Sequence, residues 1–246
     1  LHRSLRGEVV PLTHAEIEVT QPASIESMLD RIQPDMVINT AAYNLVDKAE
    51  TEVDAAMAAN AYGPRILAIA CNQRKVALTH ISTDFVYGLD SANTARRECD
   101  PPGPQSVYAS SKLLGEYFVR SSCPRHFVVR TCGLYGQAAT KAKGNFVKTM
   151  LRLGREKPEL KVVADQKCVP SYTRDVAEAI AREIEAQDVG LGYCSAACGA
   201  DLVFAERMLE RGAGGEVQLT DAMAKLIGQV PDVRPYVAEA SVVVVP

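Results

Sequence analysis

Strand-like and helix-like patterns of apolar and polar positions alternate along most of the chain. Short segments such as 36–39 are apolar on both faces and predict buried strands. Elsewhere apolar residues recur at the spacing of one helical face, as Ile25, Met28, Leu29 and Ile32 do. The segments expected to be strands are 9–12, 36–39, 76–82, 126–131, 160–164 and 240–246. The segments expected to be helices are 24–32, 54–72, 107–120, 145–155, 173–186, 202–209 and 222–227.

Alternation of strands and helices is typical of a parallel sheet that is covered by helices on both faces. In such α/β sheets, binding sites form beyond the carboxyl ends of the strands. We therefore expect functional residues at 39–43, 82–88 and 131–136. The segment 88–104, which is rich in Asn, Asp, Pro and Gly, is expected to be a loop.

The composition is that of an ordinary globular protein. Its 246 residues are 47% hydrophobic and 23% charged, enough to bury one large core. The net charge is −3 without a long run of one sign, which argues against a nucleic-acid partner. No apolar run approaches the ~20 residues of a membrane span and no secretory leader is visible, so we expect no membrane and a cytoplasmic location. The seven cysteines show neither disulfide nor metal spacing and are expected to be reduced thiols.

Three residues point to proton chemistry, namely Thr83, Tyr108 and Lys112. Tyr108 and Lys112 lie four positions apart on an expected helix, so the ammonium can favour the ionised phenol. Thr83 ends an expected strand and Tyr108 opens the helix after the next loop, so both can reach one edge of the sheet. The composition alone gives about 0.4 such Tyr–Lys pairs by chance, so the position is what makes the pair informative. The alternative is a surface Tyr and Lys on an amphipathic helix.

Several longer stretches occur in a fixed order along the chain. They are 35–43 (DMVINTAAY), 46–50 (VDKAE), 60–64 (NAYGP), 82–84 (STD), 108–112 (YASSK), 144–150 (GNFVKTM) and 165–166 (DQ). From about residue 9 to residue 180 the sequence resembles the extended short-chain dehydrogenases, and more closely the dTDP-4-dehydrorhamnose reductases. The resemblance implies a doubly wound parallel Rossmann-type sheet over residues 1–136. A small, mainly substrate-binding portion would cover 137–246, with some elements returning to the core.

The resemblance also implies the reaction and its residues. NADPH or NADH would reduce the 4-keto group of a dTDP-6-deoxy-hexulose while Tyr108 protonates the C4 oxygen. Lys112 would lower the pKa of Tyr108 and hold the nicotinamide ribose, and Thr83 would hydrogen-bond the carbonyl. The implied cofactor-binding residues are Ala41, Ala42, Tyr43, Asn60, Tyr108 and Lys112. The implied substrate-binding residues are Thr83, Asp84, Tyr108, Asn145 and Gln166.

Other candidate residues have simpler explanations. Asp84 can cap backbone amides at a strand-to-loop turn. The charged cluster at 47–50 is expected to be the solvated start of a helix. His80 lies inside an apolar strand and is expected to be a satisfied core histidine. Cys132 and Cys168 adjoin site motifs but have no adjacent base, so we do not expect them to be nucleophiles.

The sequence departs from the family pattern in two respects. It lacks a glycine-rich turn after a first strand, and its only dense glycine cluster, 212–215, is expected to end a helix. We expect about a dozen residues to precede Leu1 in the parent protein, with residues 1–6 continuing the first helix. The missing strand is central, so exposed inner sheet edges, weak cofactor binding and aggregation are expected. Gly133 and the pair 168–169 also differ from the usual Trp and Gly-Ser, which leaves the identity of the sugar open.

Several alternatives remain open at this stage. The protein can be another nucleotide-sugar reductase or epimerase, or a non-catalytic regulatory subunit on the same fold. The segment 12–14 offers no clear acid or arginine pair to decide between NADPH and NADH. Some relatives bind Mg²⁺ at a subunit contact, but the sequence contains no compact carboxylate cluster that would commit us to it. A homodimer is one oligomeric state that the sequence leaves open.

Overall fold

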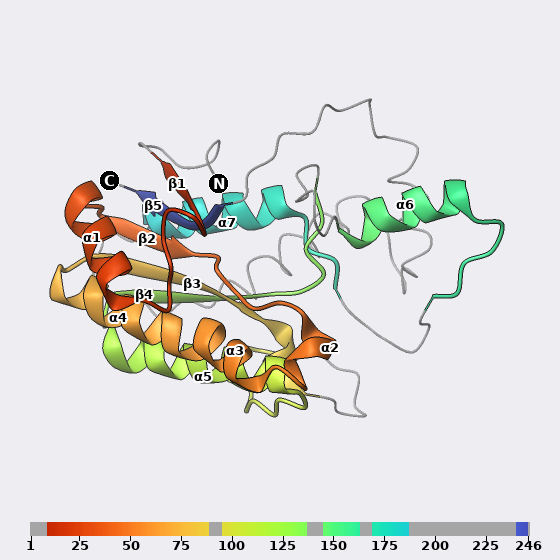
Figure 1. Cartoon of the computed structure of the whole chain (residues 1–246), viewed down its shortest axis with the longest axis horizontal. Coiled ribbons are helices and arrows are strands. Elements are labelled where there is room, and N and C mark those ends of the chain that lie inside the picture. The colour runs from red at the N-terminus through yellow and green to blue at the C-terminus, as the bar shows by residue number, and fades with distance from the viewer. Residues whose placement is uncertain (1–8, 89–94, 137–144, 163–168, 187–239, 246) are drawn as a thin grey trace.

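A five-stranded sheet forms the centre of the structure, a computed structural model that describes residues 9–88, 95–136, 145–162, 169–186 and 240–245 (Figure 1). The strands are β1 (Val10–Thr13), β2 (Met36–Asn39), β3 (Ala77–Thr83), β4 (His126–Thr131) and β5 (Ala240–Val245). Their order across the sheet is β1-β5-β2-β3-β4. β2, β3 and β4 run parallel, so Asn39, Thr83 and Thr131 all end strands at the same edge. The predicted α/β architecture is confirmed.

The helices have the following bounds: α1 (Pro22–Ile32), α2 (Val46–Ala49), α3 (Val53–Met57), α4 (Gly63–Gln73), α5 (Val107–Ser122), α6 (Phe146–Glu156) and α7 (Thr173–Ala186). Two shorter turns are η1 (Ala58–Tyr62) and η2 (Asp84–Tyr87). In the part of the chain that the structure describes, no helix is both long and apolar enough to cross a membrane. The predicted helices at 202–209 and 222–227 lie outside the described residues.

The inner strands are buried on both faces because helices cover the sheet from two sides. Val37 and Leu78 pack into one core with residues of α1, α4 and α5. Their neighbours Ile38 and Ala77 face the opposite way and pack against Val176 of α7. Figure 1 shows α4 and α5 on one side of the sheet and α7 on the other. The continuous apolar runs in the sequence thus reflect strands covered twice.

The predicted helix over 54–72 is continuous in space but is divided into three parts. α3 passes into the π-helical turn η1, and α4 follows directly from Gly63. Pro64 stands in the first turn of α4, directly after this change of helix type. π-turns are rare and are frequent at functional sites. Here the turn carries Asn60, whose side chain reaches the site described below.

β5 corrects the expectation that the inner edges of the sheet are exposed. It lies between β1 and β2 and runs antiparallel to both, pairing Val242 with Leu12 on one side and with Asn39 on the other. An apolar, β-branched segment satisfies the backbone groups of both neighbours, which is why those edges are not open. The otherwise parallel sheet therefore has an antiparallel strand at an inner position.

The predicted strand at 160–164 is wrong over the residues that are described. Residues 160–162 have no strand partner and follow α6, which extends away from the sheet in Figure 1. Without a neighbouring edge, an apolar segment cannot form ladder hydrogen bonds, whatever its β propensity. The other predicted strands agree with the structure within one or two residues at each end.

Candidate active site

Thr83 and Tyr108 meet at the carboxyl edge of the sheet. Thr83 ends β3, and its hydroxyl oxygen accepts a hydrogen bond from Phe85 N at 3.2 Å, which starts the turn η2. Ser106 caps α5 by accepting from Ala109 N at 3.1 Å, which places Tyr108 in the first helical turn. The Thr83 side chain hydrogen-bonds the Tyr108 hydroxyl. The two residues that the sequence placed at one sheet edge are thus in direct contact.

Tyr108 is largely buried, and its ring lies edge-on to Phe85 with 6.0 Å between the ring centres. Burial raises the pKa of Tyr108 above its ordinary value, and the nearby Asp84 carboxylate acts in the same direction. The hydrogen bond to Thr83 opposes this rise. The phenol therefore holds its proton at neutral pH.

Lys112 lies one turn further along α5 and is completely buried. Its ammonium donates a hydrogen bond to the carbonyl oxygen of Ile81 at 2.6 Å. Burial lowers the pKa of Lys112 to about 8, with Glu116 acting in the opposite direction. The expected lowering of the Tyr108 pKa by Lys112 is not found: the pKa is raised, and the ammonium is bonded to β3. Sequence spacing placed the two residues on one face but could not fix where the long lysine side chain points.

The segment 41–43 leaves β2 at the same edge and is held by two asparagines. Asn39 Oδ1 accepts a hydrogen bond from Ala41 N at 3.0 Å. Asn60 accepts from Tyr43 N at 2.8 Å and donates to Tyr43 O at 2.9 Å. Asn60 Nδ2 also donates to Ser111 Oγ on α5 at 3.0 Å. The side chain of Asn60 is thus fully used by protein groups, so it holds the segment in place.

Asp84 and Cys132 complete the described part of the site. Burial raises the pKa of Asp84, while hydrogen bonds from Cys132 and Thr83 lower it. Cys132 follows β4 directly and lies close enough to influence Tyr108. Cys132 lies within 131–136, where functional residues were expected, although the sequence suggested no role for its thiol. Its place immediately after a strand was the signal that it would line the site.

Comparison with known proteins assigns the chain to a family. The model described as the RmlD substrate binding domain matches residues 2–197. The chain belongs to this family. The dTDP-4-dehydrorhamnose reductase of Aggregatibacter actinomycetemcomitans is 37% identical over 186 residues, 75% of this chain and 61% of that protein. The Bacillus subtilis spore coat polysaccharide biosynthesis protein SpsK is 37% identical over 173 residues, 70% of this chain and 59% of that protein.

A solved structure also resembles this RmlD-family chain. The dTDP-4-dehydrorhamnose reductase of Bacillus anthracis, in complex with NADP, matches with a TM-score of 0.67 and 35% identity. The match covers 80% of this chain and 71% of that one. The chain itself spans 59% to 61% of the length of the two curated relatives named above.

Asn145 is the other predicted substrate-binding residue that lies within the described part of this RmlD-family chain. Asn145 caps α6, accepting from Lys148 N and donating to Gly136 O, both at 2.9 Å. Its side chain is therefore bound to backbone groups. Gln166 and Cys168 lie outside the described residues.

Glu50 has a contact that the sequence did not suggest. Its carboxylate accepts a hydrogen bond from Val107 N at 2.9 Å, at the first turn of α5. A carboxylate at this position accepts a hydrogen bond from an otherwise unpaired backbone N–H. Its negative charge also interacts favourably with the positive end of the helix dipole. Part of the cluster at 47–50, expected to be a solvated helix start, thus anchors the helix that carries Tyr108. No local signal predicts a contact across 57 positions.

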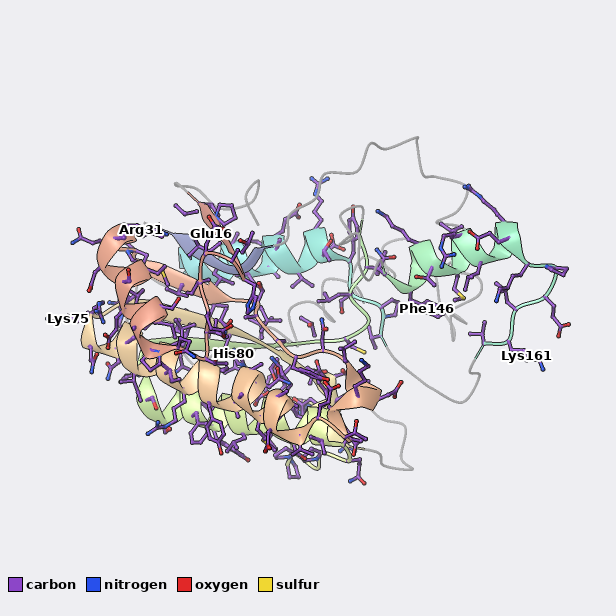
Figure 2. All side chains as sticks on the ribbon, viewed as in Figure 1. Glu16, Arg31, Lys75, His80, Phe146 and Lys161 are labelled. Carbon is purple, nitrogen blue, oxygen red and sulfur yellow. The ribbon has the colours of Figure 1, made fainter. Side chains whose placement is uncertain are left out.

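His80 is buried as expected, but only one of its ring nitrogens is satisfied. Asn39 Nδ2 donates to His80 Nδ1 at 3.2 Å, which places the ring proton on Nε2. Among the described residues that Nε2 has no hydrogen-bond partner, and it lies against Gly115 of α5. Burial, with the Lys112 charge, holds the pKa of His80 well below its usual range. Figure 2 shows His80 between the sheet and the helices on one side.

The described residues contain no group of three or more His, Cys, Asp or Glu side chains that could hold a metal ion. The hydroxyls of Thr83 and Tyr108 can donate a proton or a hydrogen bond to a carbonyl oxygen. The Thr83 side chain contacts the Tyr108 hydroxyl and also donates to Asp84 Oδ1 at 3.2 Å.

Proposed function

We propose that this chain carries the catalytic part of a reductase that uses NADPH or NADH to reduce the 4-keto group of a dTDP-6-deoxy-hexulose. In this proposal the substrate is dTDP-4-dehydrorhamnose and the product dTDP-rhamnose. The observation that supports it best is the contact between Thr83 and Tyr108 beside the buried Lys112. Family membership and the two named dTDP-4-dehydrorhamnose reductases point to the same substrate class.

The roles of the residues follow from their environment. Tyr108, protonated at neutral pH, donates its proton to the oxygen at C4 as that oxygen gains charge. Thr83 hydrogen-bonds the same oxygen and orients it toward the phenol. Lys112 does not lower the pKa of Tyr108 in the free site; in this proposal its buried ammonium stabilises the phenolate that remains once the proton has passed to the sugar oxygen. Asp84, Asn145 and Gln166 are proposed to contact the nucleotide sugar.

The residues at this edge fit the nicotinamide end of a dinucleotide, which supplies a hydride when bound. The segment 41–43 carries two small side chains, Ala41 and Ala42, and is fixed at this edge by two side-chain amides. Lys112 and Tyr108 would hold the ribose. Among the described residues no glycine-rich turn follows a strand, so we assign no residue to the pyrophosphate.

The test is oxidation of NADPH, and separately of NADH, in the presence of dTDP-4-dehydrorhamnose. Tyr108→Phe removes the proton donor and should lower kcat by roughly 10²- to 10⁴-fold, with little change in fold. Tyr117→Phe makes the same change at an exposed position of α5 and should leave the rate unaltered. The measurement is repeated with a strand and glycine-rich turn added before residue 1, because no such turn follows a strand among the described residues.

The outcomes separate this proposal from its rivals. Turnover that is lost in Tyr108→Phe and kept in Tyr117→Phe supports the reductase. Interconversion of sugars without net consumption of NADPH would indicate an epimerase. A folded chain that binds both NADPH and the sugar nucleotide but never oxidises NADPH would rule the reductase out.

A further inference from the structure

A buried ion pair lies directly behind the Thr83–Tyr108 site and takes no part in the proposed reaction. Arg130 of β4 donates from Nε to Glu116 Oε1 at 2.9 Å and from Nη2 to Glu116 Oε2 at 2.6 Å. Both side chains are almost completely inaccessible, at 3% for Arg130 and 0% for Glu116. This two-pronged geometry is the strongest form of a carboxylate–guanidinium contact.

The other contacts of the pair all lead to elements that carry the site. Ser82, which directly precedes Thr83, donates to Glu116 Oε1 at 2.5 Å. Arg130 Nη1 donates to the Tyr87 hydroxyl at 2.6 Å, and the guanidinium lies over the Tyr87 ring at 4.7 Å. Tyr87 ends η2, the turn that Thr83 begins. The pair therefore connects α5 and β4 to both sides of Thr83.

The same pair sets the charge around Lys112. Glu116 lies one helical turn after Lys112 on α5 and favours its charged form. The other ionisable groups nearby are His80 of β3, which is neutral, and Arg120 of α5, which is 3.7 Å from Glu116 Oε2 and partly exposed. In the low dielectric of this region, Glu116 is the buried carboxylate that stabilises the positive charges of both Lys112 and Arg130.

We propose that Glu116 and Arg130 are positioning residues for the site: they fix the strand end that carries Thr83, and Glu116 sustains the positive charge of Lys112. This inference rests on the proposed function for its link to catalysis. Its electrostatic part concerns only this chain's own residues. It can therefore be tested without any turnover.

The expected signs differ between a charge effect and a packing effect. Glu116→Gln keeps the size of the side chain but removes the carboxylate that favours the charged form of Lys112 and leaves the buried Arg130 cation unpaired, so the pKa of Lys112 should fall below about 8. A shift of about one unit is typical for the loss of one close opposite charge. Adding Arg130→Met removes the remaining cation, so the double variant should bring the pKa back toward its starting value. If the shift in the Lys112 pKa came from a packing defect, it would be larger in the double variant and would not reverse.

The experiment follows the Lys112 Cε resonance by NMR in protein labelled with ¹³C-lysine, using Lys112→Met to assign the signal. The same samples give the pH profile of NADPH oxidation. In Glu116→Gln the loss of rate at high pH should begin about one pH unit lower, and the double variant should restore it. Glu156→Gln, at the exposed end of α6, is the matched control and should change neither measurement.

The Lys112 titration in these variants supports or overturns the positioning role of Glu116 and Arg130. A downward shift that the second substitution reverses supports the inference, and if no variant oxidises NADPH the reductase function alone fails. An unchanged Lys112 titration in folded Glu116→Gln overturns the inference, whatever the rate. If Glu116→Gln does not fold, Arg120→Gln replaces it. Removing that partly exposed cation should raise the pKa of Lys112, and no rise would count against the proposal.

Discussion

The residue at position 115 decides how closely α5 can approach the turn that carries Asn60. A Cβ atom at Gly115 would lie 2.2 Å from the Asn60 carbonyl oxygen and 3.5 Å from His80 Nε2. Backbone cannot move aside as the end of a flexible side chain can. Glycine at this position is therefore a packing requirement and not a helix breaker.

We expect Gly115→Ala to destabilise the protein by about 1–3 kcal/mol, because the methyl group would overlap a backbone carbonyl in a packed core. Urea unfolding measures the change. Gly154→Ala is the control: its Cβ would meet only Leu160 at 4.0 Å, and alanine favours a helix by up to about 1 kcal/mol. Equal stability of Gly115→Ala and the parent chain would show that α5 and η1 are less closely packed than described here.

Tyr108 illustrates how the environment of a residue suits it to one role. Burial and the Asp84 charge raise its pKa, so the neutral, proton-bearing form dominates at physiological pH. A group in this state is a ready acid and a poor base. The reductive direction, in which a sugar oxygen gains a proton, is the one that this state favours.

At the scale of elements, the turn η1 links the proposed cofactor-binding segment 41–43 to α5, the helix that carries Tyr108 and Lys112. Asn60 within η1 makes three hydrogen bonds, two to Tyr43 and one to Ser111, the residue before Lys112. The wider hydrogen-bond spacing of a π-turn changes the direction of side chains relative to an α-helix. One residue thereby holds segment 41–43 at a set place relative to α5.

Asn60→Ala should lower the free energy of unfolding by about 1–3 kcal/mol, because it leaves the Tyr43 N–H and carbonyl without these partners. It should also weaken NADPH binding several-fold, since segment 41–43 is no longer fixed. Denaturation and fluorescence titration with NADPH measure the two effects. Asn72→Ala, at an exposed position on α4, should alter neither. Unchanged binding in folded Asn60→Ala would separate Asn60 from the proposed cofactor-binding segment.

Elements and strand ends could be predicted from the sequence because their signals are local. The strand at 36–39 and the helix at 173–186 match the structure residue for residue, and Thr83 and Tyr108 stand where β3 ends and α5 begins. Apolar periodicity and flanking turn residues determine such features within a few positions.

Contacts between distant segments could not be predicted in this way. The hydrogen bond from Val107 N to Glu50 joins positions 57 apart. The ammonium of Lys112 donates to the Ile81 carbonyl, which lies 31 positions away. The π-turn has no separate sequence signal, because it needs only a change of hydrogen-bond partner within a helical run. For 160–162 the local pattern was misleading, since a strand requires a neighbouring edge.

At the scale of the whole molecule, the place of β5 was the feature least accessible from the sequence. The segment was expected to be a strand, but which strands it would join depends on the folded sheet. It lies between β1 and β2, where a doubly wound order has its first strand, and it runs in the opposite direction. Because it runs antiparallel, β5 ends at the opposite edge of the sheet from Asn39 and Thr83.

The stability of the sheet should therefore depend on β5. In Val243→Pro the proline removes an N–H in the middle of a strand that pairs on both sides, with Pro11 in β1 and Ile38 in β2. We expect the free energy of unfolding to fall by about 1–3 kcal/mol. Aggregation should increase as the edges of β1 and β2 become available to other chains. Thermal unfolding and light scattering measure the two effects.

Val162→Pro is the matched control, because Val162 is exposed and belongs to no helix or strand. Both variants lose one backbone N–H and one valine side chain, so any difference between them reports on the position and not on the substitution. If Val243→Pro unfolds and scatters light as Val162→Pro does, β5 contributes nothing to the sheet in solution. The two inner edges would then be open after all, as the sequence pattern first implied, and aggregation of the parent chain itself should be as strong as that of the variant.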